Sequence, residues 1–367
     1  FTTHTPVAAG HDRFDRDLVS SLLGEQAASD LDAVGCLPDG ELNMTILGMT
    51  VSRFVNAVAF KHRGVSRAMF PAFGITSVTN GVHLRTWAAP STARMLDAHI
   101  EGWAEDNSLV RYATTIPLEE VAAAHASAKA ALLARIAEAR PEAKFDPAAL
   151  TIGLARRAAA YKRLGLLFRD PERLRAFVSR IGTLQVVCSG KAHPDDAQGK
   201  AVIRMLHEAA AELAPEVGFA YLENYTMGLA REIVAGSDIW LNTPERPLEA
   251  SGTSGMKAAV NGVPSLSILD GWWIEGAVEG VTGWSIGGDE SPVVDTAHGA
   301  SRLGDADEAD SLALQDKLAL VGETFYSDGD GLAEIRRSTI ALNGSFFTSQ
   351  RMFAEYAGRA YSTGRAE

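Results

Sequence analysis

The segment with the strongest chemical character is the run of eleven residues from Pro247 to Lys257, PLEASGTSGMK. Its Ser- and Gly-rich turn leads into a predicted helix that begins at Thr253. The N–H groups in the first turn of a helix have no partners within the helix, and the helix dipole favours an anion beside them. Lys257 follows one turn later, so its amine can reach over the same place. The run therefore predicts a phosphate site with a lysine beside it.

A lysine amine beside a bound phosphate suits pyridoxal phosphate, because the amine can form a Schiff base with the aldehyde while the helix start holds the phosphate. Glu249 precedes the turn and offers only acceptor oxygens, which can take sugar hydroxyls. A turn of this composition with a lysine is more often an ordinary helix start. By itself, the run leaves both interpretations open.

A second cluster, LARRAAAYKR from Leu154 to Arg163, follows a predicted strand and places four cations within eight residues. Such a cluster is either a solvated basic patch or an anion site, since guanidinium and ammonium groups both bind phosphate. Two phosphates ~5 Å apart would repel by roughly 7–13 kcal/mol at an effective dielectric of ~20. Arg156, Arg157, Lys162 and the helix start at Thr253 suit two adjacent phosphates better than one.

The overall composition narrows the class of protein. The 367 residues are long enough for two domains, and 46% hydrophobic with 22% charged residues is typical of a globular protein. The formal net charge of −12 argues against a nucleic-acid partner. The nine His and two Cys residues show no metal-ligand spacing, and so few cysteines indicate a reducing compartment without a disulfide framework. No apolar run approaches the ~20 residues that cross a bilayer, so no membrane association is expected.

Two zones of secondary structure are expected. Residues 1–88 have the pattern of helices broken by loops, with helical spacing over 41–70 and a short β-like segment over 74–82. After a long helix over 118–139, short apolar runs alternate with helical segments, which is typical of a parallel sheet with helices on both faces. The predicted strands are 150–154, 183–188, 218–222, 239–241 and 263–268. The predicted helices are 171–180, 195–213, 227–235, 253–260, 311–322 and 346–361. A loop is expected over 285–310.

Ligands of such sheets bind outside the carboxyl ends of the strands. Arg156, Asn224 and Glu249 each follow a predicted strand, so the rule places them near one crevice. Other residues carry less information alone. His4 is a lone histidine, Asn80 is a turn former before Gly81, and Trp87 and Tyr225 have the character of core aromatics.

Together these residues resemble those of the α-glucan phosphorylases, the glycogen, starch and maltodextrin phosphorylases. The resemblance follows the family's order from Phe1 to about Trp284 and is strongest to the short-type bacterial branch. It includes Thr3-His4-Thr5-Pro6, Thr79-Asn80-Gly81, Arg156-Arg157 with Tyr161-Lys162, Asn224-Tyr225, and Glu249-Ala250-Ser251-Gly252-Thr253 followed by Met256-Lys257.

The resemblance implies an α/β fold of the GT-B type, in which two Rossmann-like domains face each other across a cleft. Residues 1–88 would be the mostly helical end of an N-terminal glucan-binding domain that is only partly present. Residues 89–345 would form a complete Rossmann-like domain that binds pyridoxal phosphate and substrate phosphate, and residues 346–367 a C-terminal helix that packs back towards the first domain. A cytoplasmic location is implied, and a homodimer stays open for the full-length protein.

The implied reaction is phosphorolysis, in which inorganic phosphate removes glucose from the non-reducing end of an α-1,4-glucan as α-D-glucose 1-phosphate, with retention. The aldehyde of pyridoxal 5'-phosphate would only tether the cofactor, while its phosphate exchanges a proton with the substrate phosphate. By resemblance, the catalytic residues are Lys257, Arg157, Lys162, Glu249 and His4. The residues that would hold the cofactor are Lys257, Thr253, Ser254, Arg156, Tyr225 and Trp87. The residues that would hold the substrates are Arg157, Lys162, Tyr161, Asn80, His4, Glu249, Ser251 and Gly252. No metal is expected.

This chain departs from the family pattern in three ways. It has Ser254-Gly255 where many members have Gly-Asn, and Ala159-Ala160 where many have His-Glu. It also opens at Phe1 in mid-pattern, which predicts a fragment without the upstream glycine-rich loop near the substrate phosphate. Two alternatives therefore stay open: a catalytically incomplete fragment that binds cofactor or glucan, and a nucleotide-sugar-dependent GT-B glycosyltransferase, which has no need of an amine at Lys257.

Overall fold

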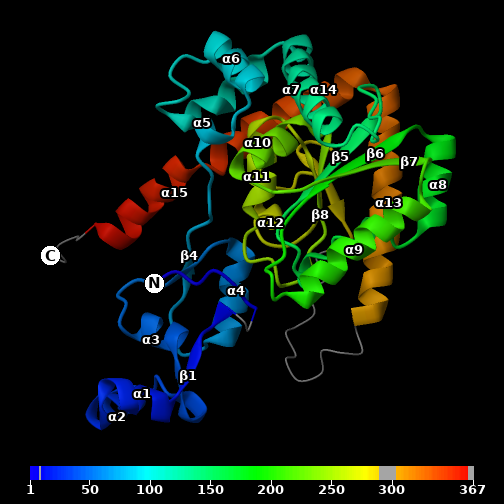
Figure 1. Ribbon diagram of the computed structural model, residues 1–367. Helices are drawn as coiled ribbons and strands as arrows, with labels where there is room; N and C mark the ends of the chain where they lie inside the picture. Colours follow the sequence, from blue (N-terminus) through cyan, green and yellow to red (C-terminus); the bar gives the residue numbers. More distant parts are fainter. Residues whose placement is uncertain (8–9, 289–302, 363–367) are drawn as a thin grey trace.

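The computed structural model describes residues 1–7, 10–288 and 303–362. Figure 1 shows a small N-terminal arm, formed by the described residues between 1 and 81, beside a larger region built on a parallel sheet. The sheet has six strands in the order β10-β9-β8-β5-β6-β7, all parallel. Their bounds are β5 Leu150–Ala155, β6 Leu184–Ser189, β7 Val217–Leu222, β8 Ile239–Asn242, β9 Ser265–Ile268 and β10 Gly283–Ile286. This is the α/β architecture expected of the larger region.

The strand order reverses at the pairing of β5 with β8. From there β6 and β7 extend to one side, and β9 and β10 extend to the other. In an open parallel sheet, the loops at the carboxyl ends of two such strands leave in opposite directions and open a crevice between them. Arg156 directly follows β5 and Thr243 directly follows β8, so the crevice lies between the basic cluster and the segment that leads to Glu249.

Helices cover both faces of the sheet (Figure 1). One hydrophobic core joins the sheet to α7 Leu118–Ala139, α10 Met227–Gly236 and α11 Thr253–Val260, and another joins it to α8 Pro171–Arg180, α9 Ala197–Glu212 and α13 Leu303–Ser327. Every residue of β5 is buried, which explains its continuous apolar run rather than an alternating one. None of the helices in the described residues is long and apolar enough to cross a membrane.

Most of the predicted elements of the sheet region are present. The five predicted strands occur with their bounds shifted by at most two residues, and the helices over 118–139, 171–180 and 253–260 have the predicted bounds. The strand β10 at the sheet edge was missed because it borders the Gly-, Asp- and Ser-rich stretch that was predicted as a loop. The predicted helix over 346–361 is a helix over Ser349–Tyr356 (α15) followed by a π-helical turn over Ala357–Tyr361.

The prediction of a loop over 285–310 is wrong at both ends, where the structure describes the residues. The strand β10 reaches Ile286, and α13 begins at Leu303 instead of 311; residues 289–302 lie outside the described residues. Long-range ion pairs explain the early start of this helix. Asp307 pairs with Arg163 at 2.6 Å, and Asp310 pairs with both Arg163 and Arg246. Local sequence does not reveal such partners.

The helical spacing predicted over residues 41–70 is also wrong as one continuous pattern. This segment forms β2 Glu41–Asn43, α3 Met44–Thr50, β3 Asn56–Ala57 and α4 Phe60–Met69. The break follows from tertiary pairing, because β3 runs beside β4 Thr76–Ser77. Of the β-like segment predicted over 74–82, only β4 forms a strand. Earlier in the arm, β1 Arg13–Asp15 pairs with β2 and is followed by α1 Arg16–Leu23 and α2 Glu25–Ala33.

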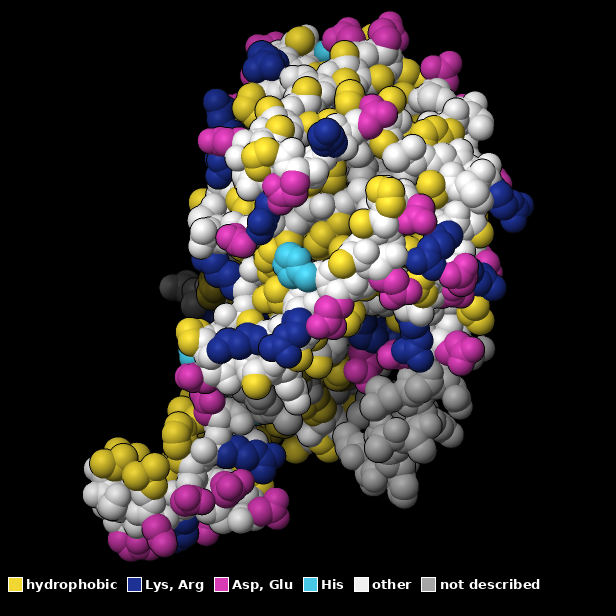
Figure 2. Space-filling view, turned by 45° about the vertical axis from the view of Figure 1, so that its right-hand side comes forward, with side chains coloured by type: hydrophobic (Ala, Val, Ile, Leu, Met, Phe, Trp, Pro, Cys, Tyr) yellow, Lys and Arg dark blue, Asp and Glu magenta, His cyan; other side chains and the backbone are white. Residues whose placement is uncertain are grey.

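The tip of the arm has little interior of its own. Its core consists of Val19, Ala28, Cys36, Leu37 and Leu42. Figure 2 shows hydrophobic side chains on the surface of the projecting lobe at lower left, where α1 and α2 lie. The exposed apolar residues of this stretch include Phe14, Leu18, Leu22 and Leu23. The arm therefore depends on contacts elsewhere in the chain for its position.

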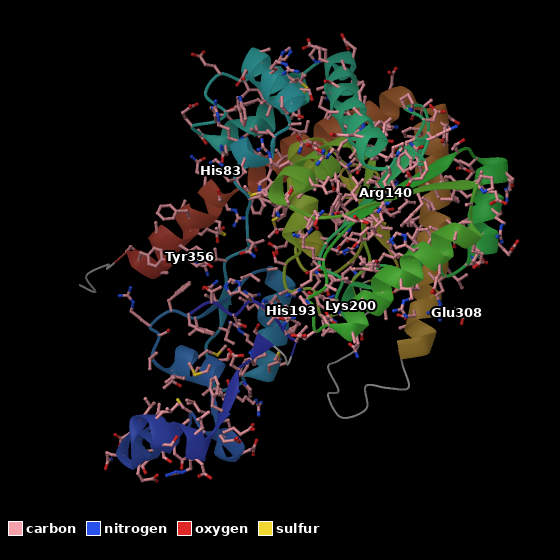
Figure 3. All side chains as sticks on the ribbon, viewed as in Figure 1. His83, Arg140, His193, Lys200, Glu308 and Tyr356 are labelled. Carbon is pink, nitrogen blue, oxygen red and sulfur yellow. The ribbon has the colours of Figure 1, made fainter. Side chains whose placement is uncertain are left out.

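The C-terminal helical segment supplies such contacts. Tyr356, labelled on α15 in Figure 3, accepts a hydrogen bond from the side chain of Asn56 at 2.9 Å. Arg351 donates to the carbonyl oxygens of Thr79, at 2.7 Å, and of Asn80, at 3.0 Å. This segment therefore holds the turn that carries Asn80 against the rest of the molecule.

A buried ionic network lies at the opposite edge of the sheet from the crevice, at the amino ends of β5 and β8. The Asp238 carboxylate accepts hydrogen bonds from Lys129 at 2.6 Å, from His125 at 2.9 Å and from Arg336 at 3.1 Å. It also accepts the N–H of Thr151 in β5 at 2.8 Å. Burial would raise the pKa of Asp238, but the His125 hydrogen bond and the charges of Lys129 and Arg336 outweigh burial and lower it.

Replacing Asp238 by Asn should destabilise the protein strongly. Lys129 and Arg336 would then be buried cations without a counter-charge, and breaking a buried pair in this way costs about 3–5 kcal/mol. The free energy of unfolding from urea denaturation measures the effect. Asp316→Asn is the matched control, because its carboxylate is 77% exposed and pairs with Arg173 at the surface, where the expected change is below about 0.5 kcal/mol. Equal losses in the two variants would contradict the assigned role of the network.

Candidate active site

A cavity of about 400 Å³ opens at the carboxyl ends of β5 and β8, between the sheet region and the arm. The site residues predicted from the sequence line it, with the exception of Trp87 and of Asn224. The predicted residues that line it are His4, Asn80, Arg156, Arg157, Tyr161, Lys162, Tyr225, Glu249, Ser251, Gly252, Thr253, Ser254 and Lys257. The strand-end rule was wrong for Asn224, which lines a different cavity together with Arg140 and Glu223. The structure therefore brings together residues that are up to about 250 positions apart in the sequence. Their roles stay predictions.

The helix α11 points its amino end at this cavity. Gly252 precedes the helix with a φ of 81°, a left-handed conformation that glycine adopts without strain. No side chain caps α11, so the N–H groups of its first turn keep their donors for a ligand. Thr253 and Ser254, which carry two of these groups, line the cavity. An anion fits this place in both charge and hydrogen bonding.

Lys257 presents its amine without a carboxylate partner. Within the described residues, its recorded contact is with the ring of Trp87, whose centroid lies 4.1 Å from Nζ. Burial lowers the pKa of Lys257, which raises the fraction of neutral amine at neutral pH. A neutral amine is the form that attacks an aldehyde. Trp87 therefore contacts Lys257 without lining the cavity itself, and its role in the site stays a prediction.

The two consecutive arginines are in different situations. The Arg156 side chain is buried, and it donates hydrogen bonds to the Asn242 side chain and, at 3.0 Å, to the Leu241 carbonyl oxygen. Burial lowers the pKa of Arg156 to about 10, which leaves it charged at neutral pH. The Arg157 side chain is exposed and has no hydrogen bond or ion pair with any residue that the structure describes. Arg156 therefore links β5 to β8, and Arg157 is free to meet an anion.

Lys162 is paired with Glu249 across the cavity. Its Nζ contacts the Glu249 carboxylate, and both side chains are largely buried, with exposures of 14% and 6%. The same Nζ lies 4.7 Å from the centroid of the Tyr161 ring. The sequence had suggested Lys162 for phosphate and Glu249 for sugar, without a contact between them. In the structure each charge is partly neutralised by the other.

The turns that carry these residues are fastened to each other and to α13. The N–H of Glu245 donates to the Tyr161 carbonyl oxygen at 2.7 Å, which joins the basic turn to the turn before Glu249. Arg163 and Arg246, one from each turn, both bind Asp310 of α13. These contacts leave the cavity walls with little freedom to separate.

Several polar groups of the cavity have unused hydrogen-bonding capacity. The Ser251 hydroxyl is buried and has no partner among the described residues. His4 is exposed at the cavity mouth, and Asn80 reaches it from the arm. Sequence reasoning missed Thr5, Val58, Ala155, Leu248 and Ala250, which complete the lining. Thr5, Leu248 and Ala250 lie inside the recognised motifs, whereas nothing in the sequence marked Val58.

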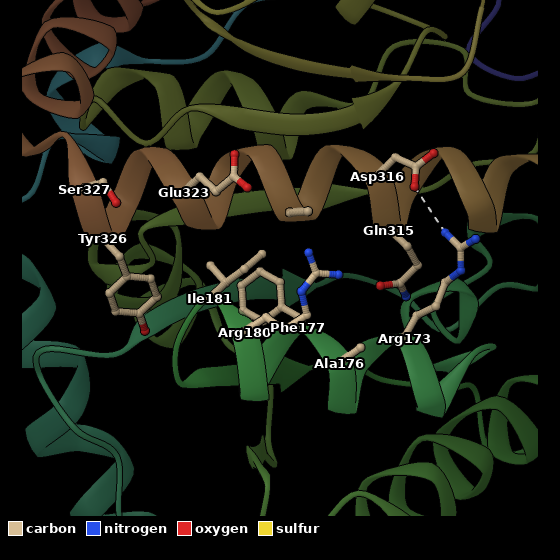
Figure 4. Close-up of a pocket in the computed structure, with 11 residues that line it drawn as sticks. Arg173, Ala176, Phe177, Arg180, Ile181, Gln315, Asp316, Glu323, Tyr326 and Ser327 are labelled. Carbon is tan, nitrogen blue, oxygen red and sulfur yellow. Dashed lines mark hydrogen bonds and ion pairs between the residues drawn. The ribbon is translucent and has the colours of Figure 1, made fainter.

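A second cavity, of about 470 Å³, lies between α8 and α13 and is shown in Figure 4. Its charged groups include Arg173, which is bound to Asp316 at 3.1 Å, and Arg180. None of the site residues predicted from the sequence lines it. This cavity also lies between helices rather than at the strand ends, so the cavity beside α11 is the candidate active site.

Comparison with known proteins identifies the family of this chain. The family model described as Phosphorylase, carbohydrate phosphorylase, matches residues 11–358. The chain is 36% identical to the maltodextrin phosphorylase of Thermococcus litoralis and 35% identical to the glycogen phosphorylase of Mycobacterium tuberculosis. It is 33% identical to the glycogen phosphorylase of Aquifex aeolicus.

Each of these alignments covers 99% of this chain. It covers 46% of the first two relatives and 57% of the third, so the chain spans about half the length of the curated relatives it matches. The match of the family model extends over almost the whole chain, including the arm, the sheet region and α15. The chain belongs to the carbohydrate phosphorylase family.

Proposed function

We propose that this chain supplies the cofactor- and phosphate-binding half of an α-glucan phosphorylase. In the proposed reaction, the bond between C1 of the terminal glucose and the glucan oxygen breaks. An oxygen of inorganic phosphate bonds to C1, and the released glucan oxygen takes a proton. The product is α-D-glucose 1-phosphate, with retention at C1. The observation that carries the proposal is the meeting of an unpaired lysine, an uncapped helix start and an unpaired arginine in one cavity.

The residues around Lys257 fit pyridoxal 5'-phosphate. Among the residues that the structure describes, the amine has no carboxylate partner; its lowered pKa favours the reactive form, and the uncapped start of α11 offers donors to a phosphate. Trp87 and Tyr225 provide flat aromatic surfaces nearby, Trp87 in contact with the amine and Tyr225 on the cavity wall. When bound, the cofactor would supply a phosphate group that exchanges a proton with the substrate phosphate.

The chain's own residues would then divide the binding work. Lys257 would hold the cofactor aldehyde, and Thr253, Ser254 and Arg156 would hold its phosphate. Arg157 and Lys162 would bind the substrate phosphate. The glucosyl unit would be held by Glu249, Ser251, Gly252, Asn80, His4 and Tyr161. Cations placed before the reaction begins stabilise the charge that develops in the transition state without reorganising during it.

The charge balance of the cavity makes Arg157 the central residue for phosphate. Arg156 already donates to Asn242 and Leu241, and Lys162 is paired with Glu249. Arg157 alone among the three keeps its hydrogen-bond donors unused within the described residues. Two phosphates ~5 Å apart repel each other by several kcal/mol, so a second phosphate needs a positive charge beside it. Arg157 would supply most of that charge.

This chain matches about half the length of its relatives, and this favours a second candidate function. In this second candidate, the chain binds cofactor and phosphate without turning over a substrate. Measuring glucose 1-phosphate release from maltodextrin separates the two. The assay would compare this chain alone with a protein in which the upstream half of a relative is restored. A nucleotide-sugar transferase is disfavoured, because it gives no reason for the unpaired amine of Lys257. The cytoplasmic location and a homodimer stay predictions.

Incubation with pyridoxal 5'-phosphate and reduction with borohydride should attach the cofactor covalently to Lys257. The desolvated, unpaired amine is the best nucleophile, and the helix start orients the aldehyde towards it. Peptide mass mapping locates the attachment, and Lys257→Met should abolish it. Lys200→Met is the control, since Lys200 lies on α9 and does not line the cavity. Attachment at Lys200 or elsewhere with equal yield would contradict the cofactor site.

Arg157→Ala should weaken the binding of inorganic phosphate to the cofactor-loaded protein by about tenfold or more, the equivalent of one or two hydrogen bonds to a charged group. Cofactor loading should stay at the wild-type level. Isothermal titration calorimetry measures the first quantity and absorbance of the bound cofactor the second. Arg180→Ala removes an exposed arginine at the other cavity and should change neither. If Arg157→Ala abolished cofactor loading, the division between the two arginines would be wrong.

A further inference from the structure

The turn that follows β9 lies directly beneath the turn that carries Glu249. The N–H of Glu249 donates to Oδ2 of Asp270 at 2.9 Å, and the N–H of Trp272 donates to the Ser251 carbonyl oxygen at 2.8 Å. Gly271 packs so closely that an added Cβ would lie 2.5 Å from the same carbonyl oxygen, and its φ is 55°. The backbone of residues 249–251 therefore takes its position from residues 270–272.

The arm contacts this same turn through the first residues of α4. Lys61 donates to the Leu269 carbonyl oxygen at 3.1 Å, and its Nζ lies 3.8 Å from Oδ1 of Asp270. The N–H of Phe60 and the hydroxyl of Thr79 both donate to the Glu275 carboxylate, each at 2.8 Å. The segment from Leu269 to Glu275 is thus held by the arm on one side and supports Glu249 on the other.

We propose that Asp270 is a positioning residue that sets the place of Glu249 in the cavity and, through Lys61, couples it to the arm that carries His4 and Asn80. The inference deepens the proposed function, because it rests on Glu249 holding the glucosyl unit. Asp270 itself does not line the cavity and acts only through Glu249.

Burying the Asp270 carboxyl group costs free energy, and this cost supports a functional reason for an aspartate at this position. Asp270 is 1% exposed, and its Oδ1 accepts no hydrogen bond among the described residues. Buried charges with incomplete partners destabilise a fold, and a neutral side chain of the same size would cost less. The two carboxylate oxygens nevertheless face different groups: Oδ2 accepts the Glu249 N–H at 2.9 Å, and Oδ1 forms an ion pair with the Lys61 ammonium group at 3.8 Å. An amide could offer an oxygen to only one of them.

Replacing Asp270 should therefore affect the stability of the protein and the position of Glu249 in different ways. Burial raises the pKa of Asp270 to about 6. The Glu249 N–H, the Lys61 charge and the Gly271 N–H oppose this rise, and the Glu249 charge adds to it. Because the folded protein binds this proton more tightly than the unfolded chain, stability falls as the pH rises from the ordinary value of 3.8 to about 6, and the ionised group carries its full cost at pH 8. Removing the charge relieves this cost at pH 8 but leaves one of the two donors facing an amide nitrogen.

The test compares Asp270→Asn with the wild type after both are loaded with pyridoxal 5'-phosphate. We expect a melting temperature at pH 8 equal to or above that of the wild type. The dissociation constant for α-D-glucose 1-phosphate should rise about tenfold, whereas that for inorganic phosphate should change less than threefold. Lys61→Met should weaken glucose 1-phosphate binding in the same direction, and the double variant should be no weaker than Asp270→Asn alone. Asp316→Asn is the matched surface control.

Each outcome decides between the interpretations. Selective loss of glucose 1-phosphate affinity with full stability supports positioning of Glu249. Wild-type affinity in Asp270→Asn, or a lower melting temperature with equal weakening of both ligands, would overturn it in favour of a merely structural role. Wild-type protein that neither loads the cofactor nor binds either ligand would overturn the proposed function itself, and the inference with it.

Discussion

The pairing of β5 with β8 is the constraint on which the rest of the structure depends. It is the place where the strand order reverses, and it is fastened at both ends by buried charge. At the amino ends, Asp238 gathers three basic side chains and the Thr151 N–H. At the carboxyl ends, Arg156 spans from β5 to Asn242 and Leu241. Because both ends are held, the turns that leave the two strands open a cavity of definite shape.

The cavity owes its chemical character to the way its charges are shared. Lys162 and Glu249 satisfy each other, and Arg156 is committed to the sheet. Arg157 and Lys257 are left without anionic partners in the part of the chain that the structure describes. The protein has a net charge of −12, but these two groups and the uncapped start of α11 make the cavity locally positive.

The arm and the sheet region meet through polar contacts more than through a shared core. The arm has its own small hydrophobic clusters, and α15 and the turn after β9 hold it by hydrogen bonds from both sides. Contacts of this kind fix direction, because each donor must meet its acceptor at one distance and angle. A few of them therefore suffice to keep His4 and Asn80 over the strand ends.

The sequence by itself determined the parallel α/β architecture, the helix start at Thr253 and the cluster of cations after β5, because continuous apolar strands, helix starts and clustered charges are local features. His4, Asn80 and Tyr225 were predicted from the family resemblance, since each carries little information alone. Tertiary structure decided the rest. It broke the helical pattern of residues 41–70 by pairing β3 with β4, started α13 early through Asp307 and Asp310, and paired Lys162 with Glu249. It also placed Asp270 beneath Glu249. These features join residues far apart in the chain, and spacing along a sequence carries no record of such contacts.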